Sequence, residues 1–371
     1  MTSPAQATLS GSLLAPFREE LGSQLRDLTR AAEPYGPAFT ELWILTEQQI
    51  LGGKLIRPQL FLDAYGALEQ PADPVLTERD IVKLAVAIEL LHFSYLLHDD
   101  VIDGDLKRRG HPNLVAVLSD RLEARGVPRR HRDMGHLDAL HWGRTGAILM
   151  GDLLLSAVHQ IFARICAPEH IRIALLDLLD HTIRETVAGE YLDVGLSDGA
   201  IQPHLPTVLS MSAYKTASYT FQLPLRAAAI VAQQPSELER ETAAIGHHLG
   251  LAYQLQDDLL SVFGQPQDHG KDAFSDLREG KQTAIICYAR HTSCWPQIEQ
   301  DFGDPHLAVE QGENLRELLS ECGAREFVEG LIAVEIAGVE HKIAADGPHS
   351  LPEELRDVIH RYGEGLKGRA A

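Results

Sequence analysis

Three aspartates stand at the end of a long apolar stretch and could bind a metal ion. They are Asp99, Asp100 and Asp103, in the run LLHDDVID. If the stretch is helical, Asp99 and Asp103 share a face and Asp100 lies beside it. Carboxylates this close repel one another, and Mg²⁺ is the kind of hard cation that oxygen ligands suit. A DDxxD motif alone fits an exposed acidic helix end equally well, so the rest of the chain must decide.

A second acidic pair, Asp257 and Asp258, lies near the end of another apolar stretch, Leu249 to Phe263. Facing helices of a bundle commonly build carboxylate metal sites in this way. Two acidic helix ends therefore favour metal binding over chance. The fifth position of the second motif is Ser261, which leaves its third metal ligand in doubt.

Basic residues near glycines could bind phosphate groups. In GGKLIRP, two glycines allow a ligand to approach the backbone, while Lys54 and Arg57 supply positive charge. The spacing is not that of a Walker A loop, and a helix-capping turn with surface basic residues is the alternative. Five further basic residues that could bind phosphate groups follow along the chain: Arg108, Arg109, Lys215, Lys271 and Lys281.

The two arginines that follow the first acidic motif have two possible roles. Arg108 and Arg109 could simply neutralise the aspartates, or they could hold a diphosphate that the metal ions also bind. Lys215, with Thr216, interrupts an apolar helix, and a lysine is rarely buried there without a partner. Together with the two acidic helix ends, the lysines of these motifs predict a site that binds diphosphates.

Helical periodicity dominates the elements that must position these residues. Alternating strand patterns are scarce, so we expect an all-α fold. The apolar stretches expected to be helical are 80–103, 145–165, 171–192, 210–231 and 237–263. We predict a single domain over 1–371, with the motifs between about 50 and 290 and a polar, Arg-rich insertion at about 119–143.

Composition excludes several classes of protein. The 371 residues carry a net charge of −20, which argues against a nucleic-acid partner. Four cysteines without a CxxC pair indicate a reducing compartment. We recognise no signal peptide and no apolar run of about 18 residues, so we expect a cytoplasmic protein without a transmembrane segment.

The motifs taken together resemble the trans-type isoprenyl diphosphate synthases. In order, they are GGKLIRP, HFSYLLHDDVID, KRRGHPN, GDLLL, VAGEYLD, YKTAS, YQLQDDLLSVFG and DLREGKQT. The resemblance extends from about Gly52 to Thr283. It implies an all-helical bundle around a deep apolar cavity, usually a homodimer, that condenses isopentenyl diphosphate with an allylic diphosphate.

The resemblance also implies a role for each matching residue. Three magnesium ions would be bound by Asp99, Asp100, Asp103, Asp257 and Asp258. Isopentenyl diphosphate would be held by Lys54, Arg57, His92 and Arg109. The allylic diphosphate would meet Arg108, Lys215, Thr216, Gln254, Lys271 and Lys281. Among all these, the residues expected to be catalytic are Asp99, Asp103, Lys215 and Asp257.

Two residues just before the first motif are expected to set the length of the product. Tyr95 lies four residues before Asp99, so its side chain should sit below the metal site, and its neighbour Ser94 is small. The bottom of the cavity that holds the growing chain would then have one bulky and one small residue. This indicates a product of intermediate length, the twenty-carbon geranylgeranyl diphosphate. Farnesyl diphosphate, or a longer product, is the alternative.

Two other functions are compatible with part of the pattern. A class I terpene cyclase would share the aspartates and the serine of the second motif, but it would not be expected to keep GGKLIRP and His92. A catalytically silent regulatory subunit would be expected to lose aspartates, and this chain keeps both clusters.

Overall fold

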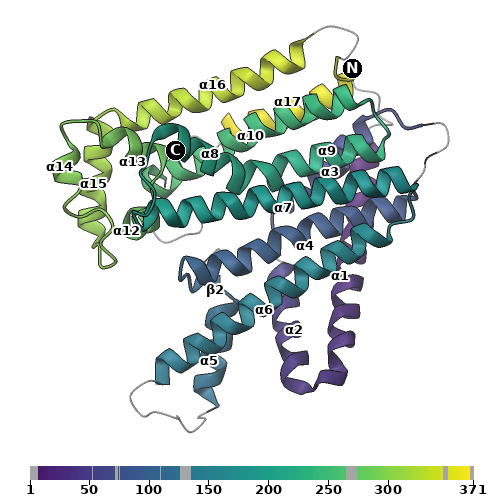
Figure 1. The fold of residues 1–371 in the computed structure, drawn as a ribbon, viewed down its shortest axis with the longest axis horizontal. Helices are drawn as coiled ribbons and strands as arrows, with labels where there is room; N and C mark the ends of the chain where they lie inside the picture. Colours follow the sequence, from purple (N-terminus) through teal and green to yellow (C-terminus); the bar gives the residue numbers. More distant parts are fainter. Residues whose placement is uncertain are drawn as a thin grey trace. The chain divides into compact units, whose positions relative to one another are not determined.

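A computed structural model describes residues 7–51, 53–71, 74, 76–108, 110–125, 135–264, 274–345 and 350–367. These residues form helices almost throughout, and their only sheet is one two-stranded ribbon (Figure 1). The all-α class predicted from the sequence is therefore confirmed. By its internal contacts the chain divides into two compact units, residues 1–62 with 75–172 and residues 63–74 with 173–371. The single-domain organisation stays a prediction.

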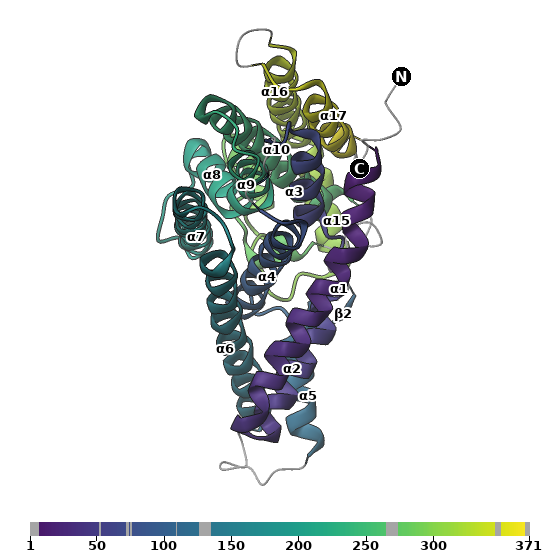
Figure 2. The same cartoon turned by 90° about the vertical axis from the view of Figure 1, so that its right-hand side faces the viewer.

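The first unit is built around the helix that ends in the first aspartate motif. This helix, α4, packs against α1 and α6, and α5 packs on α6. Figure 2 shows α2 running back beside α1. The elements are α1 (Ala7–Ala32), η1 (Glu33–Tyr35), α2 (Pro37–Ile50), the first turns of α3 (Ile56–Ala67), α4 (Glu78–Ile102), β1 (Lys107–Arg108), β2 (His111–Pro112), α5 (Leu114–Ala124) and α6 (Gly135–Arg164).

The second unit is built around α10, which carries the second aspartate motif and packs against η2, α9 and α16. Figure 1 shows α16 alongside α10. The elements are most of α7 (Glu169–Ser197), α8 (Leu205–Ser212), η2 (Ala213–Gln222), α9 (Leu223–Val231), α10 (Ser236–Phe263), α12 (Ser275–Glu279), α13 (Ala284–Ala289), α14 (Trp295–Ile298), α15 (Val309–Glu321), α16 (Ala324–Ala344) and α17 (Glu353–Lys367).

Helix α4 has a well-defined start. The Thr77 hydroxyl accepts a hydrogen bond from the Asp80 backbone N–H, and the Asp80 carboxylate accepts one from the Thr77 N–H. This reciprocal capping satisfies two of the amide groups that a helix leaves exposed at its start. The helix then runs unbroken to Ile102, so its far end presents the aspartates on a rigid element.

The segment expected as one helix at 210–231 is divided in three. Between α8 and α9, residues 213–222 form a π-helix, η2, and the Leu223 N–H bonds to the Ser218 carbonyl five residues back. Pro224 follows directly, and a proline has no N–H to continue the α-helical pattern. Because π-helical turns are rare and frequently occur at functional sites, η2 supports a functional role for Lys215 and Thr216.

The polar insertion expected at about 119–143 is largely taken up by helices. Helix α5 continues to Ala124 and α6 begins at Gly135, while residues 126–134 lie outside the described residues. Arg121 and Arg125 both bind Glu41 on α2. These hydrogen bonds hold the pKa of Glu41 below its usual range. Part of the Arg-rich segment therefore ties α5 to α2.

Two helices are long and apolar enough to span a membrane by length and composition alone. They are α4 and residues 139–164 of α6. In an apolar 18-residue window of each, 72% and 33% of the residues are buried, respectively. From the sequence we predict no transmembrane segment. One or two such helices are weak evidence for a membrane span, because a buried core helix also meets the criterion, and most of the α4 window is buried.

Candidate functional site

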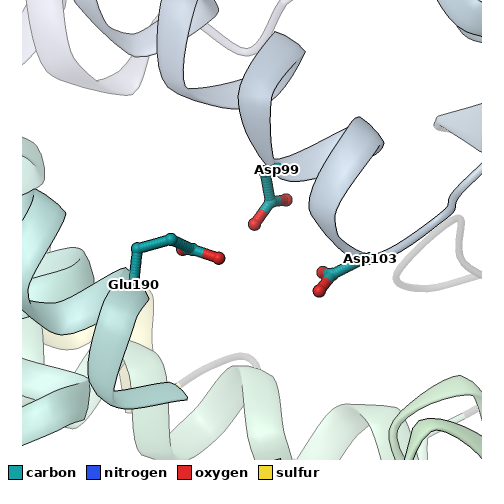
Figure 3. A group of neighbouring side chains, drawn as sticks. All are labelled: Asp99, Asp103 and Glu190. Carbon is teal, nitrogen blue, oxygen red and sulfur yellow. The ribbon is translucent and has the colours of Figure 1, made fainter. Parts of the chain in front are cut away.

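The carboxylates of Asp99 and Asp103 lie on one side of the end of α4, as their spacing predicted (Figure 3). One carboxylate oxygen of Asp99 lies within 4.8 Å of one of Asp103, and both side chains are half-buried. Asp103 is also the last residue of the helical turn, where its N–H bonds to the Asp99 carbonyl at 2.8 Å. Two anionic oxygens held this close on a rigid helix are suited to binding a cation.

Asp100 is turned toward a different partner. Its buried Oδ1 accepts hydrogen bonds from Nε and Nη2 of Arg108, at 2.8 and 2.6 Å. Arg108 Nη2 also lies 3.0 Å from Asp99 Oδ2. Burial raises the pKa of Asp100 to about 6, although Arg108 favours the ionised form. These contacts show that Arg108 neutralises the motif, and its binding of a diphosphate stays a prediction.

The β1–β2 ribbon holds Arg108 against the motif. Arg108 pairs with His111 across the ribbon, and Gly110 in the turn has a φ of 76°, a conformation that favours glycine. The Asn113 amide donates to the Asp105 carbonyl at 2.7 Å and secures the end of the turn. The other arginine of KRRG, Arg109, lies outside the described residues.

The GGKLIRP motif leads into α3, and its last three residues belong to the first turn of that helix. Lys54 is exposed, whereas Arg57 on the first turn of α3 is buried. Between them, Leu55 adopts a φ of 56°, which a leucine rarely does. Strain of this kind commonly persists where a loop must direct a functional side chain. His92, the other residue expected at the isopentenyl site, is buried on α4.

In the second unit, a chain of hydrogen bonds joins η2 to the second aspartate motif. The Thr216 hydroxyl donates to Gln254 Oε1 at 2.6 Å, and Gln254 Nε2 donates to Asp258 Oδ1 at 2.8 Å. Burial, and then the nearby Asp276, raise the pKa of Asp258 well above its usual value. Asp257 is half-buried and so more accessible to a metal ion. Ser261 donates to the Asp258 carbonyl at 2.8 Å, which engages its hydroxyl within the helix.

Two of the predicted lysines meet at one buried carboxylate. Lys215 Nζ and Lys281 Nζ lie 2.7 and 3.2 Å from Oδ2 of Asp193 on α7. Lys215 Nζ is also 2.9 Å from Oε2 of Glu190, the third side chain drawn in Figure 3. The remaining predicted lysine, Lys271, lies outside the described residues.

Asp193 and Glu190 were not singled out as site residues, although VAGEYLD was among the motifs. The available signal was a Glu and an Asp one helical turn apart in an apolar helix. Burial would raise the pKa of Asp193, but Lys215 and Lys281 together hold it below its usual value. Asp193 is therefore an ionised, buried group.

Comparison with known proteins identifies the family. The family model described as polyprenyl synthetase matches residues 44–301. The chain belongs to the polyprenyl synthetase family.

Relatives within this family differ in the product that they are named for. A (2E,6E)-farnesyl diphosphate synthase of Mycobacterium tuberculosis is 28% identical over 326 residues, which cover 83% of this chain and 78% of the relative. A geranylgeranyl diphosphate synthase of Methanosarcina mazei is 29% identical over 283 residues, which cover 76% of each protein. A geranylfarnesyl diphosphate synthase of Aeropyrum pernix is 28% identical, covering 75% of this chain and 79% of the relative.

Among solved structures, a geranylgeranyl pyrophosphate synthase from Corynebacterium glutamicum, complexed with isoprenyl diphosphate and magnesium, has a TM-score of 0.84. It is 26% identical, and the match covers 95% of this chain and 99% of that one. This agrees with the isoprenoid synthase fold expected from the motifs. Like other polyprenyl synthetases, the chain is a prenyl-transferring enzyme, as the sequence predicted.

The residues of this polyprenyl synthetase fit magnesium chemically. Asp99 and Asp103 offer paired carboxylate oxygens at the end of α4, and Asp257 offers another in the last two turns of α10. No soft ligand such as cysteine or histidine stands in either DDxx motif. Oxygen donors alone are the set that Mg²⁺ prefers.

Proposed function

We propose that this polyprenyl synthetase condenses isopentenyl diphosphate with allylic diphosphates and that its main product is the twenty-carbon geranylgeranyl diphosphate. The observation that carries the proposal is the pair of carboxylates, Asp99 and Asp103, on one side of the end of α4. The comparisons support the reaction class, and one well-matched structure is a geranylgeranyl pyrophosphate synthase.

In this proposal Asp99, Asp103 and Asp257 hold the magnesium ions, three as the resemblance implies. Asp100 and Asp258 contribute less, because Arg108 already engages the first and Gln254 the second. When bound, magnesium neutralises the negative charge of the diphosphate and makes it a better leaving group.

Basic side chains place the two substrates. Lys54, Arg57, His92 and Arg109 hold isopentenyl diphosphate. Arg108, Lys215, Thr216, Gln254, Lys271 and Lys281 face the allylic diphosphate. Lys215 and Lys281 favour departure of the leaving group, because their positive charge stabilises the negative charge that develops on it.

The chemistry that these residues would support has three steps. The allylic carbon–oxygen bond breaks, and its electron pair leaves with the diphosphate. The double bond of isopentenyl diphosphate then forms the new carbon–carbon bond to the allylic cation. A proton is lost to restore a double bond, and the released diphosphate accepts it. An apolar cavity, expected for the family, would exclude water from the cation.

The chain-length proposal rests on two residues of α4. Ser94 is fully buried, and its hydroxyl donates to the Leu91 carbonyl at 2.7 Å. Tyr95 is half-buried and stands one turn before Asp99. A large ring beside a small side chain would limit the growing tail without stopping it early.

The test is an assay with Mg²⁺, labelled isopentenyl diphosphate and each of the dimethylallyl, geranyl and farnesyl diphosphates in turn. We expect a twenty-carbon product to predominate. A fifteen-carbon main product, or one of thirty carbons or more, would refute the proposed length. A cyclic hydrocarbon or alcohol made without isopentenyl diphosphate would identify a terpene cyclase instead. Asp99→Ala should abolish turnover and leave the fold intact, because it removes a metal ligand.

We also propose that the protein is a cytoplasmic homodimer without a nucleic-acid partner. Helix α6 supports the homodimer, since it exposes several large apolar side chains in the first unit: Trp142, Ile148, Leu149 and Leu153. Exposed apolar groups on one helix commonly mark a protein interface. Light scattering in solution should give twice the mass of the chain, and a monomeric mass at micromolar concentration would contradict the proposal.

A further inference from the structure

Asp193 gathers two lysines that come from different elements. Lys215 lies on the π-helix η2, and Lys281 lies in the segment after α12. Both ammonium groups are within hydrogen-bonding distance of the same oxygen, Oδ2. The two nitrogens must therefore lie near each other, at a separation that the oxygens of one diphosphate group could meet.

The side chain of Asp193 is less exposed to solvent than the side chains of the two lysines. The side chain of Asp193 is 7% exposed, whereas those of Lys215 and Lys281 are 22% and 14% exposed. The carboxylate is thus less accessible to solvent than the side chains of the two lysines that bind it. A ligand that arrives from solvent would meet the lysines first.

Helix α7, which carries Asp193, also packs closely against the backbone of Lys215. A Cβ atom at Gly189, one turn before Asp193 on α7, would lie 2.2 Å from the Lys215 backbone nitrogen. Only glycine permits so close an approach of α7 to η2. Gly189 and Asp193 therefore constrain the two ends of Lys215, its backbone and its ammonium group.

We propose that Asp193 is a positioning residue for the leaving diphosphate, because its Oδ2 holds the ammonium groups of Lys215 and Lys281 together where one diphosphate can meet both. The inference rests on the proposed function, which supplies the diphosphate. Asp193 itself touches no substrate and acts through the lysines. Preorganised charges of this kind need no rearrangement when the leaving group departs.

The charged groups around Asp193 define how a variant should behave. Lys215 faces it from η2, Lys281 from the segment after α12, and Asp258 from α10. The lysines also face other carboxylates: Lys215 Nζ lies 2.9 Å from Glu190 Oε2 on α7, and Lys281 Nζ lies 3.9 Å from Glu279 Oε2 on α12. Without the Asp193 charge, the two ammonium groups repel each other, and one of them loses its proton at a lower pH.

Asp193→Asn is the main test, because it keeps the shape of the side chain and removes the charge. We expect kcat to fall at least about tenfold, as for other preorganised charges near a leaving group. The KM for isopentenyl diphosphate should stay within about twofold, since other residues bind that substrate. The basic limb of the pH–kcat profile should move to lower pH by about one unit or more. A folded variant with wild-type kcat and basic limb would overturn the inference.

Two more variants separate positioning from other effects. Asp193→Glu keeps the charge but moves it by one methylene, so kcat should fall while the basic limb stays in place. Unchanged kcat in this variant would also overturn the inference, even if Asp193→Asn failed to fold. Asp180→Asn is the matched control on the exposed side of α7, and it should behave as wild type. A wild-type enzyme that is inactive with every allylic diphosphate would refute the proposed function itself, before any variant is made.

Discussion

The Thr216 hydroxyl donates a 2.6 Å hydrogen bond to Oε1 of Gln254, and this bond decides how the Gln254 amide is oriented. With the oxygen engaged by Thr216, the amide nitrogen points along the helix and donates to Asp258 Oδ1 at 2.8 Å. The π-helix η2 and the second aspartate motif are therefore coupled through a single side chain.

Thr216→Val should weaken this coupling. Valine has the shape of threonine but donates no hydrogen bond, so Gln254 Oε1 loses its donor. We expect the free energy of unfolding to fall by about 1–2 kcal/mol and kcat to fall as well, because the amide is free to turn away from Asp258. Urea unfolding and steady-state assays measure both quantities. Thr216→Ser is the control, since it keeps the donor. Wild-type values for Thr216→Val would show that the bond does not orient Gln254.

Asp258→Asn should stabilise the metal-free protein while reducing its activity. The folded-state pKa of Asp258 is raised, first by burial and then by Asp276. A raised folded-state pKa means that the protonated carboxyl favours folding, so stability is lost as pH rises from about 4. Asparagine remains neutral and can still accept from Gln254. In EDTA, the variant should therefore be more stable than wild type at pH 8, with a smaller difference at pH 5.

Chemical unfolding of both proteins at the two pH values measures the difference. Asp180→Asn serves as the control for removing a negative charge, because this residue is exposed on α7. An Asp258→Asn protein that is less stable than wild type at pH 8 would contradict the argument. It would mean that the carboxylate is a favourable ionised group in the folded protein.

Local sequence patterns predicted the features that depend on a single helix. The apolar periodicity gave the ends of α4 and α10, and the i, i+4 spacing placed Asp99 and Asp103 on one side. These outcomes follow from helix geometry alone, so no other part of the chain is needed to obtain them.

Features that depend on two elements could not be obtained in this way. The sequence left two roles open for Arg108, and its pairing with Asp100 depends on how the β1–β2 ribbon turns. The meeting of Lys215 with Lys281 requires a third element, α7, to bring Asp193 between them. Periodicity likewise does not report the π-helical form of η2 or its close approach to α7 at Gly189.

Gly189→Ala should displace η2, because the new Cβ would lie 2.2 Å from the Lys215 backbone nitrogen. The neighbouring atoms are backbone and cannot turn aside, so we expect a loss of about 1–3 kcal/mol in unfolding free energy together with a large loss of kcat. Gly330→Ala is the matched control in the exposed part of α16, where nothing lies within 4 Å of the added methyl group. It should gain about 0.5–1 kcal/mol, since alanine favours the helix over glycine.

Thermal melting and kinetic assays of both alanine variants test this contrast. If Gly189→Ala were as stable and as active as wild type, the close packing of α7 on η2 would not fix Lys215. If Gly330→Ala were destabilised as strongly as Gly189→Ala, the loss would arise from glycine replacement in general and not from the contact with η2.

Tyr95→Ala should lengthen the product by at least one isoprene unit. The half-buried ring of Tyr95 stands one helical turn before Asp99, so on the proposed geometry it blocks a tail that extends from the metal site along α4. Removing the ring leaves space that further condensation can fill, whereas Tyr95→Phe keeps the bulk and should keep the wild-type product. Chromatography of dephosphorylated products from labelled isopentenyl diphosphate compares the three proteins. An unchanged product from Tyr95→Ala would show that another residue limits the length of the prenyl chain. A longer product from Tyr95→Phe would show that the hydroxyl, not the ring, limits elongation.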